Sequence, residues 1–431
     1  MGYALPAVPG FFPLDEELAL LPGSLTPHLQ ECLVRLGTWM PFGAAGELLR
    51  AFSGVTVTAA TVRRQSEKAG AALAAVQDEE AARIKEEMPP APRGPEKQLL
   101  SVDGAMVPLL HGQWAEVKTL VIGEIEEAVQ ERGEWAVHSG QLSYFSRLTD
   151  SKAFEWLALG ETHRRGVENA RQVCAVTDGA DWEQSFIDLH RPDAVRILDF
   201  AHAAERISQM GQVVFGEGTP EAMSWLTLQL HQLKHEGPAG VLAELRTLAQ
   251  THAGMSLLDE NLAYLQKREA HMQYPSYQLQ GLPIGSGAVE SGNKLVVEAR
   301  LKGAGMHWAQ PHVNPMLALR NVVCNARWEE AWPQIVTSLR RQVAEQRRVR
   351  QRSHCATVPI LPEPAPPSVP PDASVTPIPP LFSDAVSQPA PAAIAAGPKQ
   401  PHRPAPDHPW RHSPIGRARY KPREPKPHAK T

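Results

Sequence analysis

Three acidic residues stand at positions where a sheet-based catalytic site needs them. Asp103 lies inside an apolar run typical of a β-strand, Asp178 ends a second such run, and Glu290 lies in the first turn of a later helix. Carboxylates that converge repel one another unless cations lie between them. Oxygen ligands favour Mg²⁺ or Mn²⁺, and two such ions about 4 Å apart suit an in-line phosphoryl transfer. The three acids therefore predict a two-metal site.

The segment around Glu290 is a glycine-rich turn that leads directly into a helix, with the sequence IGSGAVESGNK from residue 284. Glycines allow the backbone to approach a ligand closely. Lys294, Arg300 and Lys302 add positive charge along this helix, which suits contact with DNA phosphates. The alternative for Glu290 is an ordinary helix start, where an acid in the first turn meets the helix dipole.

The aspartates also have structural alternatives. Asp103 and Asp178 each precede a glycine, and Asp-Gly is a common turn dipeptide. A turn at Asp103 would, however, interrupt a strand that continues through Ala105 and Val107. Asp199 also ends an apolar run, competes with Asp178 as the second acid, and precedes His202 by three residues. Asp199 and His202 are accessory candidates, as a helix cap with a phosphate-binding histidine or as a simple cap.

The elements that would position these acids alternate in a recognisable order. Residues 99–110, 116–125 and 134–145 predict three consecutive strands, followed by a helix over 151–170. Residues 172–177 and 194–200 predict two more strands with a helix between them, which implies a parallel pair. Three meandering strands followed by alternating helices and strands is the order of the ribonuclease H-like α/β fold. That fold places acids at strand ends.

The first 76 residues predict a helical region, with a helix-turn-helix at about 43–74. Its second helix carries Thr61, Arg63, Arg64 and Lys68, side chains suited to base edges and phosphates. A plain packing hairpin is the alternative. Residues 77–98, charged and then proline-rich, predict a linker.

The remaining boundaries follow from composition. The first part of the α/β core is expected over 99–202, an all-helical insertion over 203–280, and the rest of the core, with the Glu290 helix, over 281–352. Residues 353–431 predict a disordered, basic tail, because 21 of the 40 prolines lie between Pro359 and Pro427.

Composition excludes several classes of protein. The chain of 431 residues has a net charge of -4 and 42% hydrophobic residues, as in ordinary globular proteins. Its four cysteines show neither zinc-site spacing nor a disulfide framework. No signal peptide or membrane span is recognisable, so a cytoplasmic protein without membrane contact is expected.

Four motifs resemble those of the DDE transposases of bacterial insertion sequences, most closely the ISKra4-like family, which is related to the Mutator-type enzymes. They are SVDG at 101–104, VTDGADW at 176–182, DFAHAAERI at 199–207, and GSGAVESGNK at 285–294. The resemblance covers residues 25–332. It implies that Asp103, Asp178 and Glu290 bind the metal ions. Asp199 and His202 match the (C/D)-x-x-H signature of the Mutator-type enzymes.

The resemblance further implies a DNA transposase that binds terminal inverted repeats and cleaves and joins DNA strands at the bacterial nucleoid. Its partners would be double-stranded repeat and target DNA. Bringing two element ends together requires at least a dimer. Two alternatives stay open at this point: a non-catalytic DNA-binding protein derived from a transposase, and a ribonuclease H-like nuclease.

Overall fold

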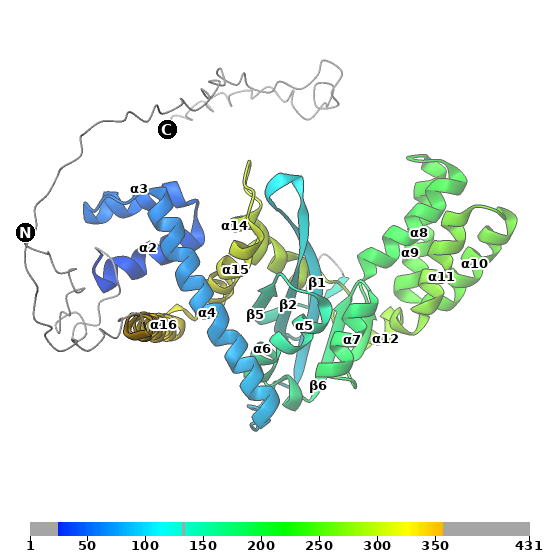
Figure 1. The fold of residues 1–431 in the computed structure, drawn as a ribbon. Coiled ribbons are helices and arrows are strands. Elements are labelled where there is room, and N and C mark those ends of the chain that lie inside the picture. Colours follow the sequence, from blue (N-terminus) through cyan, green and yellow to red (C-terminus); the bar gives the residue numbers. More distant parts are fainter. Residues whose placement is uncertain (1–24, 132–133, 357–431) are drawn as a thin grey trace, which may run out of the picture. The chain divides into compact units, whose positions relative to one another are not determined.

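The computed structural model describes residues 25–131 and 134–356 (Figure 1). The proline-rich segment predicted to be a disordered tail lies outside the described residues, apart from the end of the last helix. None of the helices in the described ranges is long and apolar enough to cross a membrane.

The protein is an α/β protein with a mixed five-stranded sheet of order β5-β2-β1-β6-β7. β1 is antiparallel to β2 and parallel to β6, β2 is antiparallel to β5, and β6 is parallel to β7. The predicted meander and the parallel pair are therefore confirmed. The strands are β1 (Lys97–Pro108), β2 (Trp114–Ile125), β5 (Ser139–Arg147), β6 (Gln172–Thr177) and β7 (Val195–Leu198).

The third predicted strand, 134–145, is wrong in its extent. Its first residues form β4 (Glu134–Ala136), which pairs only with the short β3 (Val129–Glu131), and the sheet strand β5 begins at Ser139. The alternation of apolar residues continues across both strands, so the pattern alone did not reveal the break. The short 3₁₀ helix η1 (Leu110–Gly112) joins β1 to β2.

One face of the sheet packs against three α-helices and one short 3₁₀ helix. Leu100, Val102 and Leu120 point to this face, as the two-residue period of a strand requires. They contact Phe154 and Phe186 of the covering helices. The predicted helix over 151–170 is divided into three pieces. The helices of this layer are α5 (Ser151–Leu157), α6 (Leu159–Arg164), η2 (Val167–Asn169) and α7 (Asp181–His190).

The opposite face carries the odd-numbered residues of β1, which include Asp103. Ala105 and Val107 pack there against Val289 and Val296 from the segment that follows the glycine-rich turn. This segment consists of α13, a π-helix η4, and the single turn α14, followed by the long α15. Their bounds are α13 (Gly287–Gly292), η4 (Asn293–Glu298), α14 (Ala299–Leu301) and α15 (Gln310–Cys324).

The predicted helical insertion is present and packs on the same face at the β6–β7 edge. Its apolar residues share one core with Leu99, Val176 and Ile197 of the sheet. Figure 1 draws these helices together in green. They are α8 (Phe200–Phe215), α9 (Pro220–His235), α10 (Pro238–Thr251), α11 (Ser256–Lys267), η3 (Glu269–His271) and α12 (Tyr274–Leu279).

The N-terminal helices share a core with the C-terminal ones rather than forming a separate body. Leu33 and Val62 pack in one cluster with Leu319 and Trp328. At Gly70 the helices cross so closely that a Cβ would lie 2.0 Å from the carbonyl oxygen of Pro315. The helices are α2 (Pro27–Trp39), α3 (Phe42–Ser53), α4 (Ala59–Glu87) and α16 (Trp328–Ala356).

The predicted linker at 77–98 is wrong over its first half, because α4 continues to Glu87. Its mean hydropathy is low, yet Ala81 and Ile84 are buried and Lys85 lies 3.6 Å above the ring of Trp156 on α5. Packing against α5 and α6 thus overrides the weak apolar pattern. Only residues 88–96 connect α4 to β1 without regular structure.

A buried histidine makes the stability of this layer depend on pH. His190 Nε2 lies 2.9 Å from the Glu155 carbonyl oxygen, and Nδ1 lies 3.2 Å from the Thr162 hydroxyl. Burial lowers the pKa of His190 from 6.5 to about 4, although the Glu155 carbonyl works in the opposite direction. The unfolded chain therefore binds a proton at a pH where the folded protein does not.

We expect the free energy of unfolding to fall by about 3 kcal/mol, through this residue alone, as the pH falls from about 6.5 to about 4. Urea unfolding of the wild type and of His190→Gln across this range measures the effect, because glutamine can donate to the same carbonyl without titrating. The variant should show the shallower profile. Parallel profiles would contradict the assignment.

Candidate active site

The strand register brings three aspartates to one level of the sheet. Leu100 of β1 pairs with Ala175 of β6, so the same register, continued by three residues, places Asp103 level with Asp178. Thr177 pairs with Leu198 of β7, which places Asp178 level with Asp199. Neighbouring strands lie about 4.8 Å apart. The aspartates thus follow one another across β1, β6 and β7.

Asp103 is held by two hydrogen bonds in a partly buried position. The Gly104 amide donates to Oδ1 at 2.6 Å, and Asn293 Nδ2 donates to Oδ2 at 2.8 Å. Burial raises the pKa of Asp103, and the charge of Asp178 raises it further, while the hydrogen bonds and His202 oppose this. A carboxylate destabilised by burial and by a neighbouring acid is a position that a cation would stabilise.

Asp178 begins a tight turn that a buried carboxyl group stabilises. Its Oδ1 accepts a hydrogen bond from the Ala180 amide at 2.8 Å, and Gly179 adopts a φ of +83°. Glu183 Oε2 accepts from the amides of Gly179 and Ala180 at 3.0 and 3.1 Å. Burial raises the pKa of Glu183 to about 10, helped by the hydrogen bond and charge of Asp178. Glu183 is therefore protonated at neutral pH.

Asp199 and His202 form a hydrogen-bonded pair beside the other two aspartates. Asp199 caps α8, with Oδ2 accepting from the His202 amide at 3.0 Å and lying 2.8 Å from His202 Nδ1. Its Oδ1 accepts from the Ser286 amide at 2.7 Å. Burial works to raise the pKa of Asp199, but the bonds from His202 and Ser286 outweigh it and lower the pKa.

The imidazole of His202 is partly exposed, with its Nδ1 engaged by Asp199. The hydrogen bond to Asp199 raises the pKa of His202, and the charges of Asp178 and Asp103 add to the effect despite partial desolvation. Asp199 is thus a helix cap, as both alternatives for this pair expected, and His202 lies in the field of the two other aspartates. Phosphate binding by His202 stays a prediction.

Glu290 lies on the same helical face as Asn293, three residues earlier, and Asn293 contacts Asp103. The Glu290 side chain is exposed at the surface of α13, and Oε1 accepts from the Ser286 hydroxyl at 3.3 Å. The structure therefore brings Asp103, Asp178, Asp199 and His202 together, with Glu290 on the adjoining helix. Among the described residues, no three His, Cys, Asp or Glu side chains form a group that could hold a metal ion.

Several residues of this site escaped the sequence analysis. Asn293 lies within the recognised motif, but an asparagine inside a helix carries no chemical signal of its own. Its Oδ1 is buried without a hydrogen-bond partner, which leaves that oxygen available next to Asp103. Glu183, five residues after Asp178, was indistinguishable from an acid in the first turn of an amphipathic helix. Ser286 acts mainly through its backbone amide, which no side-chain pattern encodes.

The residues predicted to contact DNA lie on two separate helices. Arg63, Arg64 and Lys68 are exposed on α4, and the hydroxyl of Thr61 lies 3.1 Å from that of Thr58 at the start of this helix. α3 and α4 are joined by a turn at Gly54, which has a φ of +72°. This arrangement leaves a basic helix face open to solvent.

On the other helix, Lys294 is exposed, and Lys302 pairs with Glu298 at 2.6 Å. Arg300 does not fit the prediction. It is 1% exposed, its Nε donates to the Gly37 carbonyl at 3.1 Å, and its guanidinium lies 4.6 Å from the ring of Phe42. Burial lowers the pKa of Arg300 to about 10. Arg300 joins α14 to the N-terminal helices, so contact with DNA phosphates is excluded in this structure.

A groove of about 500 Å³ runs beside the glycine-rich turn. Its lining includes Gly285, Gly287 and Ser291, together with Trp135, which is 66% exposed. A Cβ at Gly287 would meet nothing within 4 Å. The turn therefore offers open backbone next to the residue, Ser286, that bonds to both Asp199 and Glu290.

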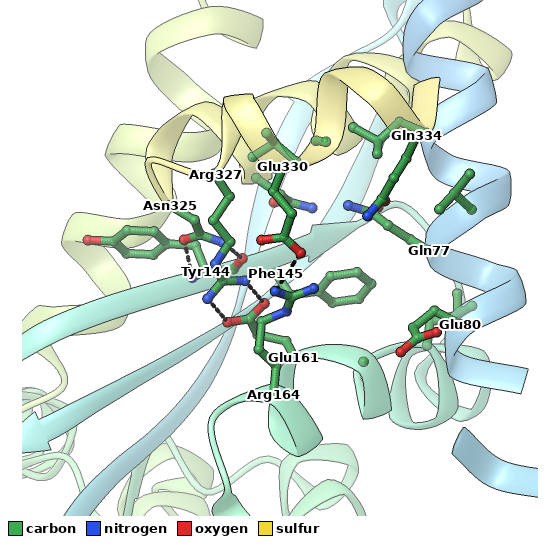
Figure 2. Close-up of a pocket in the computed structure, with 17 residues that line it drawn as sticks. Gln77, Glu80, Tyr144, Phe145, Glu161, Arg164, Asn325, Arg327, Glu330 and Gln334 are labelled. Atoms are coloured by element: carbon green, nitrogen blue, oxygen red, sulfur yellow. Dashed lines mark hydrogen bonds and ion pairs between the residues drawn. The ribbon is translucent and has the colours of Figure 1, made fainter. Parts of the chain in front are cut away.

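A second cavity, of about 100 Å³, lies between α4, α6, β5 and α16 (Figure 2). None of the site residues lines it. Four of its charged groups form pairs within the cavity: Arg327 makes a two-pronged ion pair with Glu161 at 2.6 and 2.8 Å, and Arg164 lies 2.7 Å from Glu330. The fifth, Glu80, pairs with Arg83 of α4 at 2.9 Å. With these groups satisfied, the cavity is a helix junction rather than a ligand site.

The Glu161 and Arg327 pair predicts a large stability effect, because Glu161 is 7% exposed. Glu161→Gln leaves the Arg327 guanidinium partly buried without its counter-charge, so we expect the free energy of unfolding to fall by about 3 kcal/mol. Glu330→Gln removes the half-exposed pair in the same cavity and should cost below about 1 kcal/mol. Urea unfolding of the two variants tests the difference, and equal costs would contradict it.

Comparison of the chain with protein-family models and with curated proteins finds no match.

Proposed function

We propose that the protein is a DNA transposase of an insertion sequence, with a ribonuclease H-like core and Asp103, Asp178 and Glu290 as its acids. One observation carries the proposal: the register of the adjacent parallel strands β1 and β6, continued by three residues, brings Asp103 level with Asp178 in a sheet ordered β5-β2-β1-β6-β7. In the ribonuclease H-like fold, the sheet has this order and carries its acids at this edge. The Glu290 helix packs against the same face.

The donor atoms suit hard divalent cations. Asp103 and Asp178 offer carboxylate oxygens, and the unpartnered Oδ1 of Asn293 is a further oxygen next to Asp103. Magnesium sites commonly use one or two protein carboxylates and fill the remaining positions with water and substrate phosphate. Mg²⁺ or Mn²⁺, as two ions, would supply an activated water or 3′-hydroxyl and stabilise the leaving oxygen.

The chain's own residues have separable roles in this proposal. Asp103 and Asp178 would hold the ions, and Glu290 would complete the site by turning from Ser286 toward Asp103. His202, oriented by Asp199, would donate a hydrogen bond to a DNA phosphate near the scissile bond. Arg63, Arg64 and Lys68 would bind the terminal inverted repeats, and Lys294 and Lys302 the DNA next to the site. The protein would act as a dimer or larger oligomer at the nucleoid.

The test is strand cleavage and transfer by purified protein with Mg²⁺, a labelled fragment carrying the element's inverted repeat, and target DNA. Products joined to the target, and lost in Glu290→Gln, would support the proposal. Glu96→Gln is a matched control, because this exposed glutamate pairs with Arg171, away from the proposed acids and the proposed DNA-binding residues. Absence of cleavage and joining with either metal would overturn the catalytic assignment.

One observation favours a second candidate, a DNA-binding protein derived from a transposase. Glu290 bonds to Ser286 and not to the aspartates in this structure. If the protein bound the inverted repeat tightly but cleaved nothing, this candidate would replace the first.

A further inference from the structure

The helical insertion reaches the turn that carries Asp178. Tyr264, in the last two turns of α11, donates its hydroxyl to the carbonyl oxygen of Asp178. Arg268, directly after α11, donates from Nε and Nη2 to the carbonyl oxygen of Gly179 at 3.1 and 2.6 Å. Both carbonyl groups of the Asp178-Gly179 turn are therefore bonded by side chains that lie more than 80 residues later in the chain.

These bonds complete the fixation of the turn. β6 ends at Thr177, and Gly179 has a φ of +83°, so the carbonyls at 178 and 179 leave the sheet direction. The carboxyl group of Glu183 accepts hydrogen bonds from the two amides of the turn, those of Gly179 and Ala180. The carbonyl groups of the turn are thus bonded by the insertion, and its amide groups are bonded by Glu183 of α7. Together these bonds fix the orientation of the peptide planes.

Tyr264 and Arg268 also fix each other. The guanidinium of Arg268 lies 3.7 Å from the centre of the Tyr264 ring, and its Nη1 donates to the Tyr264 carbonyl at 3.1 Å. Arg206 of α8 lies 4.7 Å from the same ring and donates to Asn261 at 3.3 Å. Arg268 is only 8% exposed, and the neighbouring Leu265 belongs to the core of the insertion. The two side chains thus have little freedom to leave the turn.

We propose that Tyr264 and Arg268 are positioning residues that hold the Asp178 turn in its cation-binding geometry, which makes the insertion part of the active site's support. This inference rests on the proposed function. The sequence alone assigned no chemistry to the insertion, since its residues are spaced for helix packing. Loss of either side chain should weaken cation binding at Asp178 and slow cleavage, while the basic face of α4 continues to bind DNA.

The test compares Arg268→Lys and Tyr264→Phe with Lys267→Met. The last is the matched control, because Lys267 forms an exposed ion pair with Asp181 at 2.7 Å and does not contact the turn carbonyls. Manganese affinity, measured by electron paramagnetic resonance without DNA, should fall about 10- to 100-fold in Arg268→Lys, less in Tyr264→Phe, and not in the control. Single-turnover cleavage should fall in the same order, with the DNA dissociation constant unchanged.

Amide hydrogen exchange over residues 177–184 gives a readout independent of catalysis. Faster exchange in the two variants and not in the control would show that the insertion holds the turn. Unchanged exchange or unchanged manganese affinity would overturn the inference. If the wild type binds manganese at Asp178 and responds to these variants but never cleaves DNA, the proposed function fails while the positioning role stands.

Discussion

Asp103→Asn is expected to lower strand cleavage by at least about 10³-fold, the scale on which loss of one charged group of a catalytic unit acts, while the protein stays folded. Asparagine has the same shape but lacks the negative charge that would hold a divalent cation. Burial and the charge of Asp178 raise the pKa of Asp103, so the ionised form is less favoured in the folded protein than in the unfolded chain. Removing the charge should therefore leave the free energy of unfolding at pH 7 unchanged or higher.

The hydrogen bonds around the position permit the substitution. The new side-chain oxygen can accept from the Gly104 amide as Asp103 Oδ1 does. The new amide nitrogen would face Asn293 Nδ2, which is also a donor, but Asn293 Oδ1 has no partner. A rotation of the Asn293 amide by half a turn then pairs a donor with an acceptor. After this rotation one atom of the Asn293 amide is again without a partner, Nδ2 in place of Oδ1, so the number of unpaired buried atoms does not change.

Cleavage assays and urea unfolding on the same preparations test this prediction. Asp188→Asn is the control, since Asp188 is exposed and pairs with Arg196. If Asp103 is a functional acid, Asp103→Asn loses cleavage but keeps its stability. Such a trade-off is expected for a residue that serves function at a cost to stability. A loss of several kcal/mol in Asp103→Asn would instead mark a structural aspartate, and retained cleavage would remove it from the site.

The sheet and the level of the aspartates were accessible from the sequence for a physical reason. The spacing of apolar residues predicts the two-residue period of a strand. It also predicts the parallel pairing of two strands that are joined by a helix. Asp103 and Asp178 follow Leu100 and Ala175 by the same three residues, so once the strands pair in this register the two acids become neighbours. The break before Ser139 and the continuation of α4 to Glu87 depend on long-range packing, and no local pattern carries that information.

The residues that stabilise the site could not be predicted from the sequence. Glu183 is an acid in a first helical turn, Arg300 an ordinary cation near a helix end, and Tyr264 an aromatic residue at helical spacing. Each has a common surface or core role, and only the fold reveals that Glu183 and Tyr264 bind the Asp178 turn while Arg300 is buried. The π-helix η4 likewise depends on groups far away in the chain.

Arg320 of α15 binds η4 through two carbonyl groups of its backbone. A π-helix shifts the backbone hydrogen bonds by one residue and leaves carbonyl groups without helical partners. Arg320, 1% exposed, donates to the carbonyls of Leu295 and Val296, the latter at 3.2 Å, and its guanidinium lies 4.6 Å from the ring of Trp39. One side chain thus binds two carbonyl groups of the π-helix that begins at Asn293.

Arg320→Met is expected to lower the free energy of unfolding by about 3–5 kcal/mol, because the buried Val296 carbonyl and the partly buried Leu295 carbonyl lose a charged donor. Arg320→Lys keeps the charge with fewer donors and should lose less. Arg341→Met, which removes an exposed pair with Glu79, should cost below about 1 kcal/mol. Equal costs for Arg320→Met and Arg341→Met in urea unfolding would contradict this role.

The same substitution separates the π-helix from general stability. Asn293 begins η4 and holds Asp103, and Glu290 lies one turn earlier, so a relaxed backbone would move both away from the aspartates. Cleavage by Arg320→Lys, measured well below its unfolding temperature, should therefore fall more than about tenfold, as for other residues that orient ligands. Glu161→Gln, which destabilises the protein at a distant junction, should keep its cleavage rate. If Glu161→Gln loses stability but keeps its cleavage rate, while Arg320→Lys loses both, the π-helix contributes to the cleavage reaction and not only to stability.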